Sequence, residues 1–397
     1  MISTHRGVAP KPFILATITR PNLMALTLAA ICLVLAAITP PGAAGAFGLR
    51  RDAITIGPAS SASARSSSPQ FNTKAIPLPG ANGLVTLDYF AWDRTTRRLW
   101  VPAGNLADVD IIDGKTDEVT RITGFQTAKV ELRGKPVILG PTSVTIGRGV
   151  VYVGNRAGSS ICAIDASTLK LGDCIRIASP SEGLAAAPDG IVYVAPTREL
   201  WVTRGAPPLG IASPDQSITI LDASVPSKLK PKTKFSLGGS AEGYAVDERR
   251  GLFYTNLEES GQTIAIDVRS HEIVSRWRSG CDEPRGLALD KARGFLFVAC
   301  SDRVVSLDVA HGGQVVGSIA TGDGLDNIDY AETKRTLYAA ASKAATLTIA
   351  RVDDHGSLSR LGLVPTATGA RGVVAGGTET AYVADPVHGR ILKITPR

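Results

Sequence analysis

The stretch between Gly286 and Cys300 decides the fold of this chain. It consists of the apolar segment Gly286-Leu-Ala-Leu-Asp290, a polar turn, and the apolar run Leu296-Phe-Val-Ala-Cys300. Two short β-prone runs that flank a polar turn predict an antiparallel hairpin. The same unit recurs upstream, where Gly243-Tyr-Ala-Val-Asp247 precedes Leu252-Phe-Tyr254. A repeated hairpin therefore sets the architecture.

The second run of this hairpin occurs seven times, at intervals of 41 to 60 residues. Its copies are Leu99–Val101, Val151–Val153, Val192–Val194, Leu252–Tyr254, Leu296–Val298, Leu337–Ala339 and Ala381–Val383. A third run then usually ends in an aspartate, and a fourth follows a polar turn. These aspartates are Asp113, Asp165, Asp222, Asp267 and Asp308. Aspartate suits such corners because its carboxylate accepts hydrogen bonds from the N–H groups of the turn. A four-stranded unit of roughly 40 to 50 residues matches one propeller blade, so we predict an all-β, seven-bladed β-propeller of four-stranded antiparallel blades.

The longest intervals and the two ends of the repeat refine this prediction. The stretch Thr127–Gly134 is expected to be an extra excursion, and Glu199–Gly210 an inserted loop, and long loops in a tight repeat are candidate functional segments. The last unit ends after a third strand at Arg390–Thr395, whereas Phe71–Pro79 precedes the first unit without a blade of its own. We expect this N-terminal strand to complete the last blade and close the ring.

The N-terminus has the pattern of an export signal. Three cations precede the apolar run Leu23–Ile38, and the small-residue stretch Pro41–Ala46 follows it. The run is shorter than the roughly 20 apolar residues of a membrane-spanning helix. We therefore predict a signal peptide with cleavage after Ala46; an uncleaved membrane anchor is the alternative.

The predicted domain organisation follows from this signal. Residues 1–46 form the signal peptide or anchor, residues 47–70 form an Ala/Ser-rich disordered linker, and residues 71–397 form the propeller. The net charge of +7 falls to +4 in the mature chain, because the signal segment holds three cations and no acid. No block of basic and aromatic residues indicates a nucleic-acid surface. We expect a soluble, monomeric mature domain in the periplasm or outside the cell.

The cysteines support an oxidising compartment. Removal of the signal leaves four cysteines, an even number that favours disulfides in an exported protein, with three possible connectivities. Cys162 and Cys174 are expected to face one another on the third and fourth strands of one blade. Cys281 precedes the inner strand of a later blade, and Cys300 closes its second strand. We predict the pairs 162–174 and 281–300; buried free thiols are the alternative.

Several units resemble a known family, the YVTN-type β-propeller repeat proteins, including the YncE-like secreted propellers. The resemblance covers roughly Gly80 to the C-terminus and is carried by Val151-Tyr-Val-Gly-Asn155, Leu252-Phe-Tyr-Thr-Asn256 and Leu296-Phe-Val-Ala-Cys300. It implies a toroid with a central channel that serves as an exported or cell-surface binding module. Single-stranded DNA binding is described for one relative, but we do not expect it here because no basic and aromatic groove residues match.

Motifs of the common catalytic and cofactor classes are missing from the sequence. There is no Cys-x-x-Cys-His, phosphate loop, Gly-x-Ser-x-Gly elbow or His-Glu-x-x-His helix. The mature chain has four histidines, and all of them fall in predicted turns, so they do not form a metal cluster. The four tryptophans occupy unrelated places in their units, which argues against a quinone cofactor. We therefore predict no cofactor, although a divalent cation is possible.

The candidate site is a ring of polar residues at the channel mouth, where the inner strands are expected to begin. One residue comes from each successive unit: Asp88, Ser143, Glu182, Glu242, Arg285, Asp326 and Arg371. Carboxylates and arginines in this arrangement can hold a polar ligand by charge-assisted bonds or bind a cation. Alternatively, they pair with one another and only solvate the channel.

Three functions fit these features. The first is an exported, noncatalytic binding or scaffold propeller whose partner is a protein or a small polar ligand of the envelope. The second is a lactonase-like hydrolase or lyase with a divalent metal held by Glu182, Glu242 and Asp326. The third is a subunit that docks on an exported dehydrogenase. Geometry separates the first two: three converging carboxylates favour the enzyme, and carboxylates paired with Arg285 or Arg371 favour the binding module.

Overall fold

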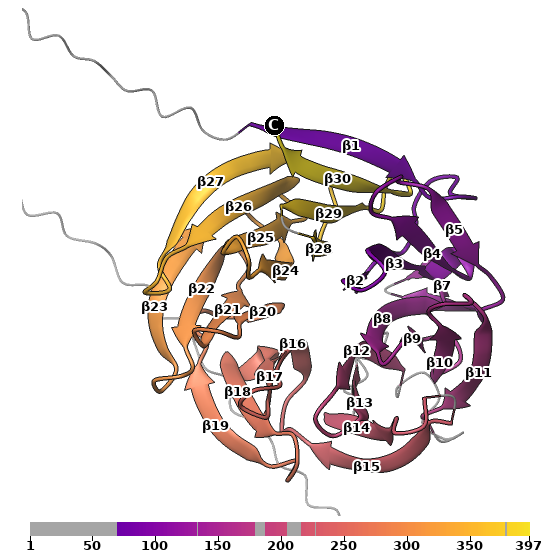
Figure 1. The fold of residues 1–397 in the computed structure, drawn as a ribbon, viewed down its shortest axis with the longest axis horizontal. Helices are drawn as coiled ribbons and strands as arrows, with labels where there is room; N and C mark the ends of the chain where they lie inside the picture. The colour runs from indigo at the N-terminus through magenta and orange to yellow at the C-terminus, as the bar shows by residue number, and fades with distance from the viewer. Residues whose placement is uncertain (1–69, 133, 179–186, 205–215, 227, 378) are drawn as a thin grey trace, which may run out of the picture. The chain divides into compact units, whose positions relative to one another are not determined.

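A computed structural model describes residues 70–397, except 133, 179–186, 205–215, 227 and 378. Seven four-stranded antiparallel sheets stand around a central axis (Figure 1). The predicted seven-bladed propeller is therefore confirmed. The predicted signal peptide and almost all of the linker lie outside the described residues.

The first three blades follow the chain from the inside of the ring to its rim. Blade 1 consists of β2 (Ala91–Asp93), β3 (Arg98–Ala103), β4 (Asp108–Asp113) and β5 (Val119–Ile122). Blade 2 consists of β8 (Pro141–Gly147), β9 (Val150–Asn155), β10 (Ser160–Asp165) and β11 (Leu171–Arg176). Blade 3 consists of β12 (Pro188–Val194), β13 (Glu199–Arg204), β14 (Ser217–Asp222) and β15 (Lys230–Ser236).

The next three blades repeat this order, and the seventh combines both ends of the propeller. Blade 4 consists of β16 (Ala241–Asp247), β17 (Leu252–Leu257), β18 (Gln262–Asp267) and β19 (Ile273–Arg278). Blade 5 consists of β20 (Leu287–Asp290), β21 (Phe295–Ala299), β22 (Arg303–Asp308) and β23 (Gln314–Ala320). Blade 6 consists of β24 (Leu325–Ala331), β25 (Thr336–Ala341), β26 (Thr346–Val352) and β27 (Leu358–Pro365). Blade 7 consists of β28 (Val373–Gly376), β29 (Thr380–Asp385), β30 (Arg390–Pro396) and β1 (Phe71–Pro77).

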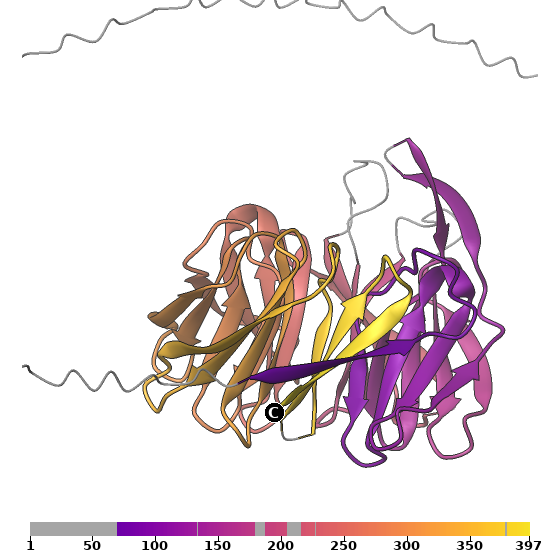
Figure 2. The same ribbon diagram turned by 90° about the horizontal axis from the view of Figure 1, so that it is seen from above.

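A hairpin and two short helices complete the described structure. The strands β6 (Ala128–Leu132) and β7 (Lys135–Leu139) pair only with each other and extend from one face of the ring (Figure 2). This hairpin is the excursion predicted between the first two blades. Two 3-10 helices, η1 (Gly104–Leu106) and η3 (Glu258–Ser260), follow the second strands of blades 1 and 4.

The core lies between neighbouring blades. Every residue of β13 is buried, whereas the outermost strand β19 alternates between half-buried and exposed residues. Successive side chains of a strand point to opposite faces, so an outer strand covers the core with only one of them. Between blades 3 and 4, Trp201 packs against Phe253 with ring centroids 4.8 Å apart. Each sheet thus buries its apolar faces against its neighbours in the ring.

The predicted closure of the ring is confirmed. Strand β1 pairs with β30 over its whole length, from Phe71 opposite Pro396 to Pro77 opposite Arg390, and Figure 1 shows the two strands side by side at the rim. Two ion pairs extend the seam to blade 1. The carboxylate of Asp117 accepts hydrogen bonds from Lys74 at 2.6 Å and from Lys393 at 2.5 Å.

The sequence-based assignment of the third blade is wrong by one strand. The triplet Val192–Val194 belongs to the inner strand β12, and the second strand is β13, with the equivalent triplet Leu200–Val202. Two similar apolar runs stand next to each other here, and periodicity alone does not separate them. The predicted loop Glu199–Gly210 therefore begins as a buried strand, and the inner strand begins at Pro188, after Glu182.

Both predicted disulfides are present. Cys162 and Cys174 lie directly opposite each other on β10 and β11, with Cα atoms 4.0 Å apart. Cys281 and Cys300 join the segment before β20 to the end of β21, with Cα atoms 6.0 Å apart. Two disulfides indicate an oxidising environment. Among the described residues, no helix has the length and apolar character needed to cross a membrane.

Candidate functional site

The mouth of the channel is built where the inner strands carry β-bulges. The pairing of the inner strand shifts register between Glu242 and Ala245 in blade 4 and between Leu325 and Ile328 in blade 6. Similar shifts occur in blades 2 and 3. A bulge changes the direction of the local side chains and interrupts pairing. The bulges thus direct polar side chains to the mouth on strands that are otherwise apolar.

Backbone contacts hold neighbouring inner strands together at the mouth. The N–H of Gly286 donates to the carbonyl of Asp326 at 2.9 Å, and the N–H of Tyr89 donates to the carbonyl of Thr142 at 3.1 Å. Gly243 has a φ of +65°, and a Cβ there would lie 2.4 Å from the carbonyl oxygen of Arg285. Only glycine adopts this conformation without strain and leaves room for the neighbouring strand.

A continuous chain of ion pairs crosses five blades. The guanidinium of Arg371, before β28, lies 3.1 Å from Asp326 of β24 and 3.1 Å from Asp88, which precedes β2. Arg156, after β9, contacts Asp189 of β12 and lies 3.9 Å from Asp88. The order is Asp326, Arg371, Asp88, Arg156, Asp189. Acids and arginines alternate, so each carboxylate of this chain faces at least one guanidinium.

The neighbouring acids further stabilise the charged form of Arg371. Asp88 raises its pKa further above the ordinary value of arginine, against the opposing effect of burial, and Asp326 acts in the same direction. For Asp326 itself, burial raises the pKa and Arg371 opposes the rise. The half-buried guanidinium therefore counters the rise that burial causes in the pKa of Asp326.

Blades 4 and 5 form a different arrangement. Arg285, before β20, lies 2.8 Å from Glu258 of η3 and 3.7 Å from Glu283. The carboxylate of Glu242 on β16 has no hydrogen bond or ion pair with any described residue. Burial, and then the negative charges of Glu258 and Asp326, raise the pKa of Glu242 to about 7. Within the part of the chain that the structure describes, Glu242 is thus an acid without a partner at the mouth.

A cavity of about 170 Å³ lies in the channel beside these charges. Its lining includes Asp88, Tyr89, Tyr244, Asn327 and Asp329. The rings of Tyr89 and Tyr244 stack with centroids 5.7 Å apart. Asp329 accepts hydrogen bonds from the N–H groups of Tyr330 and Ala375, both at 2.8 Å, and burial raises its pKa. The cavity is therefore lined by stacked aromatic rings together with polar and aliphatic groups.

Five of the seven predicted ring residues come together at the mouth: Asp88, Glu242, Arg285, Asp326 and Arg371. Ser143 is fully buried beside Gly154, and its hydroxyl has no hydrogen-bond partner in the described structure. Glu182 lies outside the described residues. The sequence assigned Glu182 to the start of the third inner strand, but Asp189 occupies that place at the start of β12.

Sequence reasoning missed several residues of the mouth: Tyr89, Arg156, Asp189, Tyr244 and Glu258. Tyr89 is next to Asp88 in the sequence, and Tyr244 lies two residues after Glu242. Both tyrosines are therefore close to acids that the sequence predicted as ring members. Arg156 directly follows the second strand of its blade and gave no distinguishing signal.

Among the described residues, no group of three His, Cys, Asp or Glu side chains could hold a metal ion.

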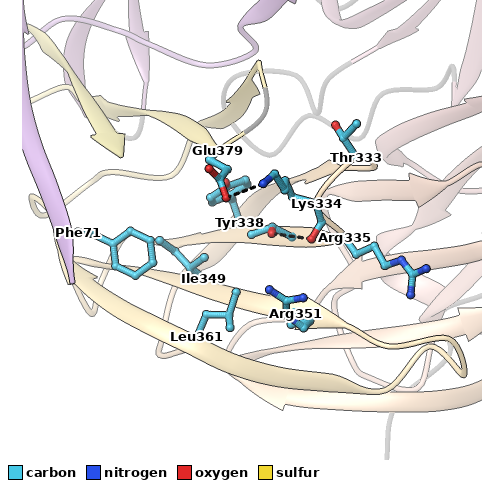
Figure 3. Close-up of a pocket in the computed structure, with 10 residues that line it drawn as sticks. Phe71, Thr333, Lys334, Arg335, Tyr338, Ile349, Arg351, Leu361 and Glu379 are labelled. Carbon is cyan, nitrogen blue, oxygen red and sulfur yellow. Dashed lines mark hydrogen bonds and ion pairs between the residues drawn. The ribbon is translucent and has the colours of Figure 1, made fainter. Parts of the chain in front are cut away.

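A larger cavity, of about 400 Å³, lies away from the channel between blades 6 and 7. Figure 3 shows Phe71 of β1 on one side, Ile349 and Leu361 near it, and Lys334 paired with Glu379. The Lys334 ammonium lies 3.1 Å from the Glu379 carboxylate. Arg335 and Arg351 also line this groove.

Comparison with known proteins shows the fold and no family. No protein-family model matches the sequence, and no curated protein matches it. The chain is similar to U3-55K (8% identity, TM-score 0.62, covering 81% of this chain and 98% of the other). It is also similar to a chain of the Mitotic Checkpoint Complex (12%, 0.62, 88% and 99%). A third similar structure is a catalytically inactive virginiamycin B lyase from Staphylococcus aureus with quinupristin (13%, 0.59, 83% and 100%). At these identities the likeness shows only a shared propeller fold.

Proposed function

We propose that this chain is an exported, noncatalytic binding propeller of the YVTN type, similar to YncE-like proteins, that holds a small polar ligand of the cell envelope at its channel mouth. The repeat units and the export pattern of the N-terminus support the family and the compartment. The two disulfides are consistent with that compartment, because disulfides persist outside the reducing cytoplasm.

One observation carries the proposal: all carboxylates of the mouth except Glu242 are paired with arginines. Arg371 lies against both Asp88 and Asp326, and Arg285 lies against Glu258. A carboxylate that is engaged by a guanidinium is a poor ligand for a catalytic metal, because the arginine already occupies its oxygens. The mouth has instead the mixture of convergent polar groups and aromatic wall that is typical of small-molecule sites.

The alternative function, a hydrolase or lyase with a divalent metal, has one observation in its favour. Glu242 is unpaired, and it was predicted as a metal ligand together with Glu182 and Asp326. The solved lyase in the comparison is inactive as a histidine-to-alanine variant, which indicates that a histidine serves its reaction. Every described histidine of this chain lies in a turn away from the inner strands: His271, His311, His355 and His388. A lyase site of that kind is therefore less favoured here.

Native mass spectrometry of the protein purified from its own envelope fraction tests the proposal. We expect a bound small organic molecule in substoichiometric to equal amount, and no stoichiometric metal by elemental analysis. A panel of lactones should show no turnover above that of a Glu242→Gln control, which lacks one of the predicted metal ligands. A stoichiometric divalent metal together with lactone hydrolysis would falsify the binding-module proposal and favour the enzyme.

A further inference from the structure

The charges at the mouth do not balance. The acids are Asp88, Asp189, Glu242, Glu258 and Asp326, and the facing arginines are Arg156, Arg285 and Arg371. The excess is negative, although the whole chain carries a net charge of +7. A negative recess on a basic protein concentrates cations locally and repels anions.

The imbalance centres on Glu242. Its nearest cation in electrostatic effect is Arg285, but that guanidinium already lies 2.8 Å from Glu258. The internal segments outside the description, 179–186 and 205–215, contain no Lys or Arg, so they cannot supply the missing charge. A largely buried carboxylate without a partner is costly. It must either take up a proton or meet a cation from outside.

The surroundings of Glu242 indicate which cation would fit. A divalent metal needs several oxygen ligands, and no described group of three donors offers them. Tyr89 lines the adjacent cavity and has no hydrogen bond to its hydroxyl among the described residues. Of the charged groups, Glu242 has the largest effect in raising the pKa of the Tyr89 phenol, after burial, so the two groups lie within electrostatic reach. A carboxylate, a free phenolic oxygen and stacked rings together suit an ammonium or guanidinium group.

We infer that the ligand of the channel mouth is a small organic cation with N–H donors, whose charged group is held by Glu242 and whose carbon skeleton lies against Tyr89 and Tyr244. This inference rests on the proposed binding function and names its ligand class. The cavity of about 170 Å³ restricts the ligand to a few carbon atoms beyond the charged group.

Calorimetric titration at pH 8 with n-butylamine hydrochloride tests the inference on the protein from the envelope fraction, after dialysis to remove bound ligand. We expect one saturable site. Tetramethylammonium, which has the charge but no N–H donor, should bind at least tenfold more weakly, and sodium butyrate should not bind. Absence of butylammonium binding, or binding of butyrate with equal affinity, would overturn the inference.

Three variants locate the site. Glu242→Gln should lower the butylammonium affinity at least tenfold, whereas Glu272→Gln, an exposed acid in an outer turn of the same blade, should leave it unchanged. Glu242→Asp keeps the charge and should retain part of the affinity. Thermal unfolding shows that the variants are folded. Equal affinity in wild type and Glu242→Gln would contradict the assignment to Glu242.

The outcomes also separate this inference from the proposed function. If native mass spectrometry finds a neutral or anionic molecule at the mouth, the cation inference is wrong and the binding module stands. If the protein instead binds Mg²⁺ or Zn²⁺ stoichiometrically and hydrolyses lactones, the proposed function itself is wrong.

Discussion

The acids on the two sides of the channel mouth differ in whether they are paired with arginines. From blade 6 through blades 7 and 1 to blades 2 and 3, acids and arginines alternate in one chain that begins at Asp326 and ends at Asp189. In blades 4 and 5, Arg285 is engaged by Glu258 while Glu242 stays without a partner. The first arrangement satisfies its own charges and joins neighbouring blades. The second leaves the Glu242 carboxylate free to bind a ligand. We therefore expect substitutions in blades 4 and 5 to affect ligand binding, and substitutions in the chain of ion pairs to affect stability.

The largest effect is expected from Arg371→Met. Loss of this guanidinium leaves Asp88 and Asp326 without their shared partner, and stranding buried charges costs about 3 kcal/mol. Urea unfolding measures the loss. The triple variant Asp88→Asn, Asp326→Asn, Arg371→Met should recover most of it. A loss below about 1 kcal/mol in the single variant would show that the paired side does not stabilise the ring.

The disulfides sharpen the comparison because one lies on each side. Replacing Cys281 and Cys300 by Ser should cost about 3 kcal/mol in the chain-entropy account and should also weaken butylammonium binding, since this disulfide closes the segment that carries Arg285. Replacing Cys162 and Cys174, on the outer strands of blade 2, should cost a similar amount and leave binding unchanged. Equal effects on binding from both replacements would argue against a one-sided site.

The unpaired Glu242 carboxylate in blade 4 should also make stability depend on pH. The pKa of Glu242 is raised to about 7 from 4.5, so between these values the folded protein holds a proton that the unfolded chain releases. The contribution of Glu242 to stability should therefore be greatest below about pH 4.5 and decrease by about 3 kcal/mol as the pH rises through 7. Unfolding curves of wild type and Glu242→Gln measure this. Burial also raises the pKa of Asp110 to about 7, so the prediction concerns the difference between the two proteins, and parallel curves would contradict it.

The smallest effect is expected from Ser143→Ala. The hydroxyl is fully buried without a hydrogen-bond partner among the described residues, so its removal should change stability by no more than about 0.5 kcal/mol, in the stabilising direction. Butylammonium affinity should remain that of the wild type. A loss of affinity in this variant would show that Ser143 contributes to the ligand site, as the sequence predicted.

The fold was largely predictable because repetition supplies the same evidence seven times. The alternating apolar runs, the aspartate corners and the unpaired strand at Phe71 each indicated a closed ring. The error in blade 3 has a physical cause: Val192–Val194 and Leu200–Val202 are both apolar, and all of their residues except the half-buried Val192 are buried. Only the pairing of β13 with β14 distinguishes an inner strand from a second strand there.

The site was predictable only where it follows the repeat. Asp88, Glu242 and Asp326 come from the starts of inner strands, so counting along each unit finds them. Which acid meets which arginine depends on bulges and on contacts between blades, and these have no local signature. The free state of Glu242 was beyond sequence reasoning for the same reason, since it follows from Arg285 being occupied by Glu258.

The pairing of β1 with β30 also determines when this protein can finish folding. Phe71 lies opposite Pro396, so β1 cannot pair with β30 until the residues between these two strands have been synthesised. Contacts of such long sequence separation are slow to form, and until then the edge of β1 is open to pairing with other chains. The strand of the propeller that is synthesised first is therefore the last one to be protected.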